Sequence, residues 1–139
     1  MADSKLRIEK IGGTSMTRFQ EVVDNIVLKN KDDIFNRIYI VSAYGGVTND
    51  LLEHKKTGQP GIYKKFEDQE DYRSAMEALK IKLCRMNEDY VSVGLDIVAA
   101  DTFIKSRIDG ATDILNAMND VLSSGYVSRK QILLEARKL

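Results

Sequence analysis

Two glycine-containing stretches in this chain bring together residue types that bind phosphate. The first is KIGGTS, residues 10–15, in which a lysine precedes a glycine pair and two hydroxyl residues. Backbone amides in a glycine turn at a helix start point toward an anion, and the helix dipole favours negative charge there. Lys10 adds a cation beside those amides. The same residues are also typical of an ordinary strand-to-helix turn, in which Thr14 or Ser15 caps the helix.

The second stretch, VSAYGGVTND at residues 41–50, repeats this arrangement after the next apolar run. Ser42 is a small hydroxyl residue, and Thr48 follows a second glycine pair. In an open α/β sheet the carboxyl ends of neighbouring strands border one ligand crevice. We therefore expect both loops to face one site, with Ser42 and Thr48 as hydrogen-bond donors. Neither loop matches a Walker A or dinucleotide fingerprint, so general rules indicate an anion site without identifying the ligand.

Hydrophobic periodicity indicates a βαβ unit around these loops. Alternation predicts a short strand over residues 6–11 that ends at Gly12, and apolar steps of three and four predict a helix over residues 16–29. RIYIVSA, residues 37–43, is typical of a central parallel strand covered on both faces. Two strands cannot form a stable, doubly covered sheet. Either further strands have weak patterns, or the chain is the front part of a larger domain.

The rest of the chain is predicted to be helical. Leu51 and Leu52 begin a short helix that the TGQPG turn ends. Apolar residues at alternating steps of four and three then predict two long helices, over residues 72–90 and 100–122, that pack as an antiparallel pair. Gly125 is a natural C-cap for the second of these helices. Ser128 is expected to cap a third helix, which continues to the last residue.

Composition excludes several classes of function. Lysine plus arginine and aspartate plus glutamate number 21 each among 139 residues, so no basic field recruits nucleic acid or an anionic membrane. No apolar run approaches the roughly 20 residues of a membrane span, and MADSKLRIEK lacks a signal-peptide core. A soluble, cytoplasmic protein of one domain is expected. No metal site is expected, because Cys84 and His54 are single residues of their types without diagnostic ligand spacing.

The two glycine motifs together resemble a known family. EKIGGTSM followed by VSAYGGVTNDLL is similar to the amino-terminal half of the catalytic domain of aspartokinase, a member of the amino acid kinase family. The usual signature is K-F-G-G-T-S, followed further along by V-S-A, a glycine, and T-N or T-D. Ile11 departs from the common phenylalanine, and Tyr44 stands at a variable position. LLEHKKTG, residues 51–58, resembles a subgroup associated with synthesis of ectoine.

This resemblance implies a fold and a reaction. The expected fold is α/β: residues 1–139 would form the amino-terminal portion of one three-layer α/β/α kinase domain, with a mainly parallel sheet and a long helical pair. The implied reaction transfers a phosphoryl group from ATP, bound with Mg²⁺, to the side-chain carboxylate of L-aspartate, for lysine, threonine and methionine biosynthesis. Such chemistry depends on positioning and charge neutralisation more than on covalent help.

The resemblance also assigns roles to residues. Lys10 would stabilise charge on the transferring phosphoryl group, and Ser42 and Thr48 would hold aspartate. The family's substrate-binding glutamate, in a G-E pair, its nucleotide pocket and its ACT regulatory domains are missing from this sequence. The chain is therefore expected to be inactive without the remainder of the kinase domain, and the family implies a homo-oligomer. The expected ATP phosphate-binding residues are Lys10, Ile11, Gly12, Gly13, Thr14 and Ser15.

Two alternatives remain open at the level of sequence. Another amino acid kinase would use glutamate, acetylglutamate, carbamate or UMP as acceptor, although the T-N-D run, residues 48–50, favours aspartokinase. A non-catalytic interaction module would use the long helices to dock a partner, and its glycine loops would only turn the chain.

Overall fold

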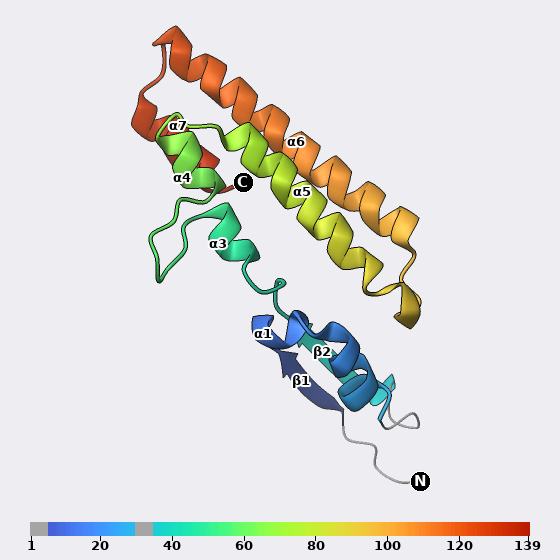
Figure 1. Cartoon of the computed structure of the whole chain (residues 1–139). Coiled ribbons are helices and arrows are strands. Elements are labelled where there is room, and N and C mark those ends of the chain that lie inside the picture. Colours follow the sequence, from blue (N-terminus) through green and yellow to red (C-terminus); the bar gives the residue numbers. More distant parts are fainter. Residues whose placement is uncertain (1–5, 30–34) are drawn as a thin grey trace.

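The computed structural model describes residues 6–29 and 35–139 as a mixed α/β structure (Figure 1). Strands β1 (Arg7–Ile11) and β2 (Arg37–Val41) lie at one end with the short helices that join them, and the long helices lie at the other. No helix within these described ranges is long and apolar enough to cross a membrane. The helical elements are α1 (Gly13–Met16), α2 (Phe19–Val22), the π-helix η1 (Val23–Val27), α3 (Val47–Leu51), α4 (Ile62–Glu67), α5 (Tyr72–Glu88), the 3₁₀-helix η3 (Val91–Val93), α6 (Ile97–Ser124) and α7 (Arg129–Ala136).

The two strands pair in parallel, as the predicted βαβ unit requires. Their register runs from Arg7 opposite Arg37 to Ile11 opposite Val41. A parallel pair needs a crossover, which α1, α2 and η1 supply. These helices cover one face of the sheet, where Ile11 is buried with residues from α1 and α2. The boundaries predicted for both strands agree with the structure to within two residues.

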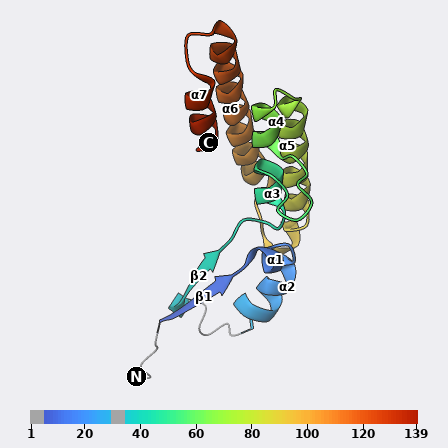
Figure 2. The ribbon, with the colours of Figure 1, turned by 90° about the vertical axis from the view of Figure 1, so that its left-hand side faces the viewer.

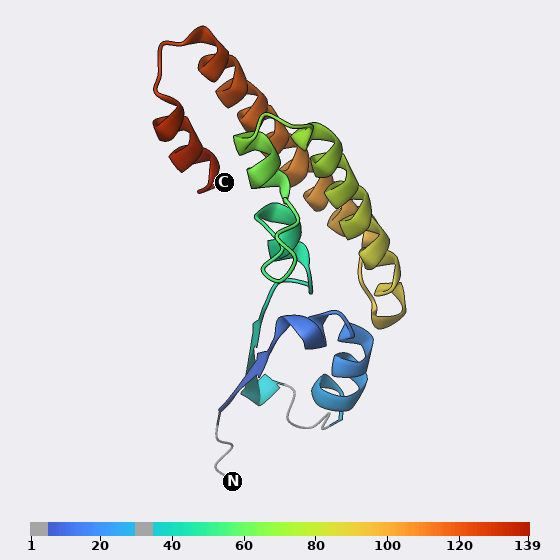
Figure 3. The ribbon, with the colours of Figure 1, turned by 60° about the vertical axis from the view of Figure 1, so that its left-hand side comes forward.

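The other face of the sheet is open, which corrects one expectation. Ile8, Ile38 and Ile40 lie on this face, and they are 66%, 48% and 52% exposed. The sequence pattern of β2 is that of a strand covered on both sides, but no described element lies over this face (Figure 3). The prediction of a doubly covered strand is therefore wrong for this chain by itself.

The helix predicted over residues 16–29 is confirmed for residues 19–27, as α2 and η1, but its predicted start is wrong because the chain turns after α1. The Thr17 hydroxyl donates to the Gly13 carbonyl at 3.1 Å, and the Arg18 amide bonds to Ser15 only three residues back. Arg18 then leaves helical geometry, with φ −119° and ψ 48°. Hydroxyl groups compete with the helical ladder in this way. The apolar spacing survives the break, so α2 and η1 still cover the sheet.

Arg37 fastens this helical layer to the second strand. Its guanidinium donates to the carbonyls of Ile26 and Val27 at 2.8 and 2.6 Å, and Glu9 on the first strand accepts at 3.4 Å. The side chain is only 4% exposed. Charge-assisted bonds to the last carbonyls of η1 complement the negative end of the helix dipole.

The structure moves the next short helix toward the glycine loop. We expected it to begin at Leu51, but α3 ends there, because Gly46 adopts φ +88° and the helix starts at Val47. The following turn closes through two backbone bonds, from His54 to Gln59 and from Gly61 to Leu52. α4 follows at once and was not predicted, since its six residues are too few for a clear period.

The predicted pair of long helices is confirmed. α5 and α6 run antiparallel over most of their lengths, and α7 returns alongside α6 (Figure 2). Asp71, Asp96 and Ser128 cap the three helices by accepting backbone N–H groups, and Gly125 ends α6 at φ +75°. The main core lies among these helices and α4, and its buried residues are Ile62, Phe66, Tyr72, Met76, Leu79, Leu115 and Ala136.

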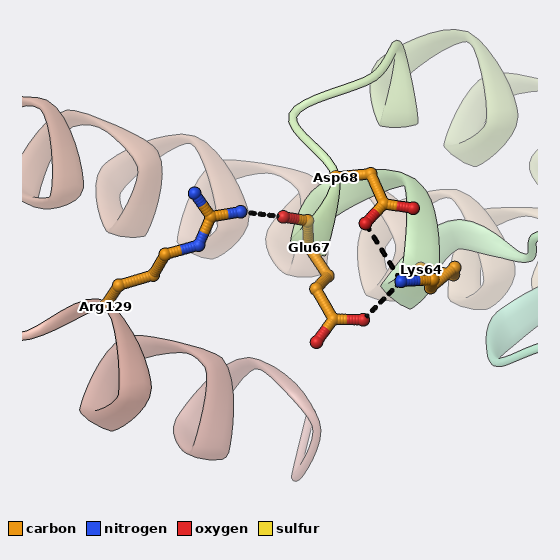
Figure 4. A network of polar contacts seen from close by, with 4 residues as sticks. All are labelled: Lys64, Glu67, Asp68 and Arg129. Atoms are coloured by element: carbon orange, nitrogen blue, oxygen red, sulfur yellow. Dashed lines mark hydrogen bonds and ion pairs between the residues drawn. The ribbon is translucent and has the colours of Figure 1, made fainter.

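A polar network joins α4 to α7 at the surface (Figure 4). The Lys64 ammonium donates to Glu67 at 3.0 Å and to Asp68 at 2.9 Å, and these bonds raise the pKa of Lys64. Arg129 donates to the Glu67 carbonyl. The Lys64 ion pairs lie within α4 and its C-cap, and such exposed pairs contribute little to stability. The bond from Arg129 is the part of the network that reaches α7.

The cap of α5 predicts a pH dependence of stability. Hydrogen bonds from Ser74, first from its side chain and then from its amide, lower the pKa of the Asp71 carboxyl. A carboxyl with a lowered folded-state pKa stabilises the fold above its unfolded pKa of about 3.9, and this contribution is lost as pH falls through the folded value. The urea midpoint would be measured at pH 7 and at pH 2.5. Its decrease between the two should be smaller in Asp71→Ser, which keeps a cap without a charge, than in wild type. Equal losses would contradict this role of Asp71.

Candidate active site

The two glycine loops lie side by side at the carboxyl edge of the sheet. The Ser42 amide donates to the Ile11 carbonyl at 3.1 Å, which extends the strand pairing into the loops. A Cβ atom placed on Gly13 would lie 3.3 Å from the Ala43 carbonyl oxygen and 3.7 Å from the Ser42 hydroxyl. The two motifs, separate in sequence, therefore line one edge, as their positions after neighbouring strands led us to expect.

Close packing between the loops requires glycine at position 45. A Cβ atom on Gly45 would overlap the Thr17 hydroxyl and lie 3.4 Å from the Gly13 carbonyl oxygen. Thr17 cannot turn away freely, because its hydroxyl bonds to that same carbonyl. The second glycine pair thus sets the distance between the loops as well as turning the chain.

Gly45→Ala is expected to destabilise the 139-residue chain by about 1–3 kcal/mol, the usual cost of overpacking. Gly110→Ala is the matched control. Its Cβ meets nothing within 4 Å on α6 of the same chain, so at concentrations where the chain is monomeric it should stabilise the fold by about 0.5–1 kcal/mol through helix propensity. Urea unfolding followed by circular dichroism measures both. Two variants of equal stability would contradict the close approach of the loops.

Lys10 lies at the rim of the open sheet face. It is the penultimate residue of β1 and is exposed. Side chains alternate along a strand, so Lys10 points away from the buried Ile11 and from the helical layer. Among the described residues no ion pair or hydrogen bond of its side chain is present. The ammonium group is therefore available to a ligand at this edge.

The first helical turn presents backbone amides at the same edge. Gly12 is the N-cap of α1 and provides no side-chain cap, so the prediction that Thr14 or Ser15 caps this helix is wrong. Both lie inside the first turn and are exposed. The first amide that bonds back is that of Met16, to the Gly12 carbonyl at 2.9 Å. The amides before it have no acceptor within the helix.

Ser42 contacts the first loop directly, whereas Thr48 lies in the helix that follows the second glycine pair. Thr48 is exposed in α3, and among the described residues it makes no hydrogen bond to residues 10–15. Its neighbours Asn49 and Asp50 line a pocket of about 250 Å³ between α3 and α5. Lys82 of α5 closes one side through an ion pair with Asp50 at 2.5 Å. The sequence analysis did not identify Lys82, because no local pattern relates α5 to the loop.

Tyr90, in the turn that follows α5, contacts residues next to both loops. Its hydroxyl donates to the Met16 carbonyl at 3.3 Å, its ring stacks on Tyr44 at 5.8 Å, and the ring of Phe19 meets its edge. Tyr90 is 5% exposed, and burial raises the pKa of the Tyr90 hydroxyl and of the Tyr44 hydroxyl. Sequence analysis placed Tyr90 only in an apolar helical stripe. Its role as a bridge depends on contacts across more than seventy residues.

The other reactive side chains do not add a catalytic group. Burial raises the pKa of the half-buried Cys84 thiol, which disfavours a nucleophilic thiolate. The His54 ring nitrogen Nδ1 accepts a hydrogen bond from the Thr57 amide at 3.2 Å and stabilises its own turn. No group of three or more His, Cys, Asp or Glu side chains suited to a metal ion occurs in the described ranges. The site offers amides, hydroxyls and one cation, which suits anion binding.

Comparison with known proteins identifies the family. Over 137 residues, 95% of its length, the chain is 39% identical to the aspartate kinase Ask_Ect of Stutzerimonas stutzeri (strain A1501). The chain belongs to the aspartate kinase family. The relative's name agrees with the ectoine-associated subgroup that LLEHKKTG resembles. The chain spans 29% of the length of this aspartate kinase. No protein-family profile and no solved structure matches the chain.

Proposed function

We propose that this chain supplies part of the active site of an aspartate kinase, which transfers the γ-phosphoryl group of ATP to the side-chain carboxylate of L-aspartate. The observation that carries the proposal is the meeting of the two glycine loops at one sheet edge beside Lys10. The family supports this choice of reaction, since the chain is 39% identical to an aspartate kinase. An anion site alone would suit many phosphate ligands.

The first loop would bind the ATP phosphates. The backbone amides from Gly12 to Ser15 would donate to phosphate oxygens, and Ile11 would contribute only its backbone because its side chain is buried. The Lys10 ammonium would neutralise charge that spreads over the transferring phosphoryl group. Mg²⁺ would arrive with ATP and share this neutralisation. Charge placed in advance where it develops in the transition state is the main source of such catalysis.

The second loop would position the acceptor. The Ser42 hydroxyl lies against the first loop, so a carboxylate bound there would be close to the phosphate-binding amides. Thr48 lies further along, which suits contact with another part of the same small substrate. Holding the two reactants in one orientation replaces a bimolecular encounter and can lower the barrier by several kcal/mol.

The open sheet face supports a larger catalytic domain. Parallel strands are normally covered on both faces, yet Ile8, Ile38 and Ile40 are exposed. The aspartate kinase relative is longer than the part that this chain matches. We propose that the remainder of the kinase domain covers this face and supplies the nucleotide pocket and the substrate-binding glutamate. The isolated chain would then be inactive, and the whole enzyme would be a cytoplasmic protein of amino-acid biosynthesis.

The test is an acceptor comparison in a longer polypeptide that contains this sequence. ADP release from MgATP would be measured with L-aspartate, L-glutamate, N-acetylglutamate, carbamate and UMP, and aspartyl hydroxamate would be trapped in parallel. The proposal expects turnover with L-aspartate and at most background release with the other acceptors. Preference for any of the other four would assign a different member of the amino acid kinase family.

A further inference from the structure

Helix α6 carries a second stripe of exposed residues beside the stripe that packs on α5. Its inner stripe joins the main core through residues such as Ile108 and Leu115. The second stripe is exposed, with Phe103 at 61%, Ile114 at 45% and Val121 at 39%. Its members follow steps of four, three, four, three and four residues, and they are Phe103, Arg107, Gly110, Ile114, Ala117 and Val121.

This spacing is that of a coiled-coil seam. Alternating steps of three and four place residues at the two inward positions of a heptad, so the six lie in one line along the helix. The line runs for about 27 Å at 1.5 Å per residue. An apolar seam of that length on the surface is suited to packing against a second helix. In Figure 1, α6 forms an outer side of the helical part, with α5 on its inner side.

The seam is complementary to itself when two copies run in opposite directions. With residue 112 at the centre, Gly110 would face Ile114 of the second copy, and Phe103 would face Val121. The smallest residue then receives a branched side chain, and the largest lies at the ends. A parallel arrangement would place Gly110 on Gly110, which leaves a gap, and would stack the two Arg107 side chains.

Charge favours the same direction. The Arg107 guanidinium lies over the Phe103 ring at 5.4 Å, and within the described residues it has no ion pair. In the antiparallel pair it would lie opposite Ala117 of the second copy. Asp113 and Asp120 flank position 117 by four and three residues, so they would lie on either side of the arginine. Neither aspartate has an ion pair among the described residues.

We propose that α6 binds α6 of a second copy of this chain in antiparallel orientation, which gives a two-fold symmetric dimer. The same patch then serves both partners, as isologous interfaces require. The apolar seam provides the affinity, and Arg107 with the two aspartates sets the direction. This interface does not depend on the kinase activity, and it lies away from the glycine loops.

Cysteine cross-linking tests the orientation directly. In a Cys84→Ala background, Phe103→Cys and Val121→Cys chains would be mixed and oxidised at a concentration where sedimentation velocity shows dimer. The antiparallel pair brings position 103 beside 121, whereas equivalent cysteines lie about 27 Å apart, far beyond disulfide reach. The mixture should therefore form disulfide-linked dimers, and each variant alone should not. Cross-linking of each variant alone, or of none, would overturn the proposal.

A charge swap tests the contacts without changing the core. Arg107→Asp should weaken dimerisation at least tenfold, as measured by sedimentation velocity. Adding Asp113→Arg in the same chain should restore most of the loss. Lys105→Asp is the control, because it makes the same charge change on α6 outside the seam and should leave the dimer intact. A chain that is folded by circular dichroism yet monomeric at about 100 μM would exclude this interface. Equal loss of dimer affinity in Arg107→Asp and Lys105→Asp would exclude it as well.

Discussion

Lys10→Ala is expected to lower the kcat for aspartate phosphorylation by about 10²–10³ in a polypeptide that contains the whole kinase domain. Lys10 lies at the edge where the two loops meet, and within the described residues it forms no ion pair that would neutralise its charge. In the 139-residue chain its side chain is exposed, so its loss there removes charge without opening a cavity. The melting temperature of the 139-residue chain should therefore change little, while turnover of the longer polypeptide falls.

The control for this variant is Lys56→Ala. Lys56 is an exposed lysine in the turn after α3, and its substitution changes the net charge by the same amount. Aspartyl hydroxamate formation at saturating MgATP should remain at the wild-type rate in this variant. A Lys10→Ala enzyme that also retains its wild-type rate would show that the transferring phosphoryl group does not depend on Lys10.

Tyr90→Ala is expected to destabilise the chain by about 3–4 kcal/mol, the usual cost of removing a buried aromatic ring. The ring is 5% exposed and contacts Phe19 and Tyr44, one residue from each loop region. Tyr90→Phe keeps these contacts and loses only the hydrogen bond to the Met16 carbonyl, so it should cost about 1 kcal/mol. Urea unfolding of the 139-residue chain measures both values.

Tyr126→Ala is the matched control for the ring. Tyr126 is 93% exposed at the end of α6, and its removal should change stability by no more than about 0.5 kcal/mol. If Tyr90→Ala proved no more harmful than Tyr126→Ala, the bridge between α5 and the glycine loops would be excluded. A loss in Tyr90→Phe as large as that in Tyr90→Ala would assign the effect to the hydroxyl alone.

The sequence predicted those elements whose signals are local. Apolar residues at regular helical spacing identify α5 and α6. Ser128 marks the start of α7 by its capping side chain, and Gly125 marks the end of α6 by its positive φ. The break at Thr17 escaped prediction because a hydroxyl bond to Gly13 competes with a helix that the apolar spacing favours. The exposure of β2 escaped it as well, since its apolar composition is typical of a strand covered on both faces, whereas no described element lies over its second face.

The same distinction applies to the candidate site. Lys10, the glycine pairs and Ser42 follow strands directly, so a general rule for α/β sheets places them at one edge. Lys82 reaches that edge from α5 and Tyr90 from the turn after α5, and no short-range pattern connects this region to the loops. The requirement for glycine at position 45 depends on Thr17, which lies in the other loop region. Residues that organise the loops were therefore harder to find than residues within them.

The most direct test of the account is whether this chain completes an aspartate kinase. The 139-residue chain would be mixed with a polypeptide that covers the part of the Stutzerimonas stutzeri aspartate kinase that the chain does not match, once light scattering shows that the two associate. Aspartyl hydroxamate formation from MgATP and L-aspartate should be absent with either piece alone and present in the mixture. Turnover by the 139-residue chain alone, or an associated mixture without turnover, would contradict the claim that it carries one part of a shared active site.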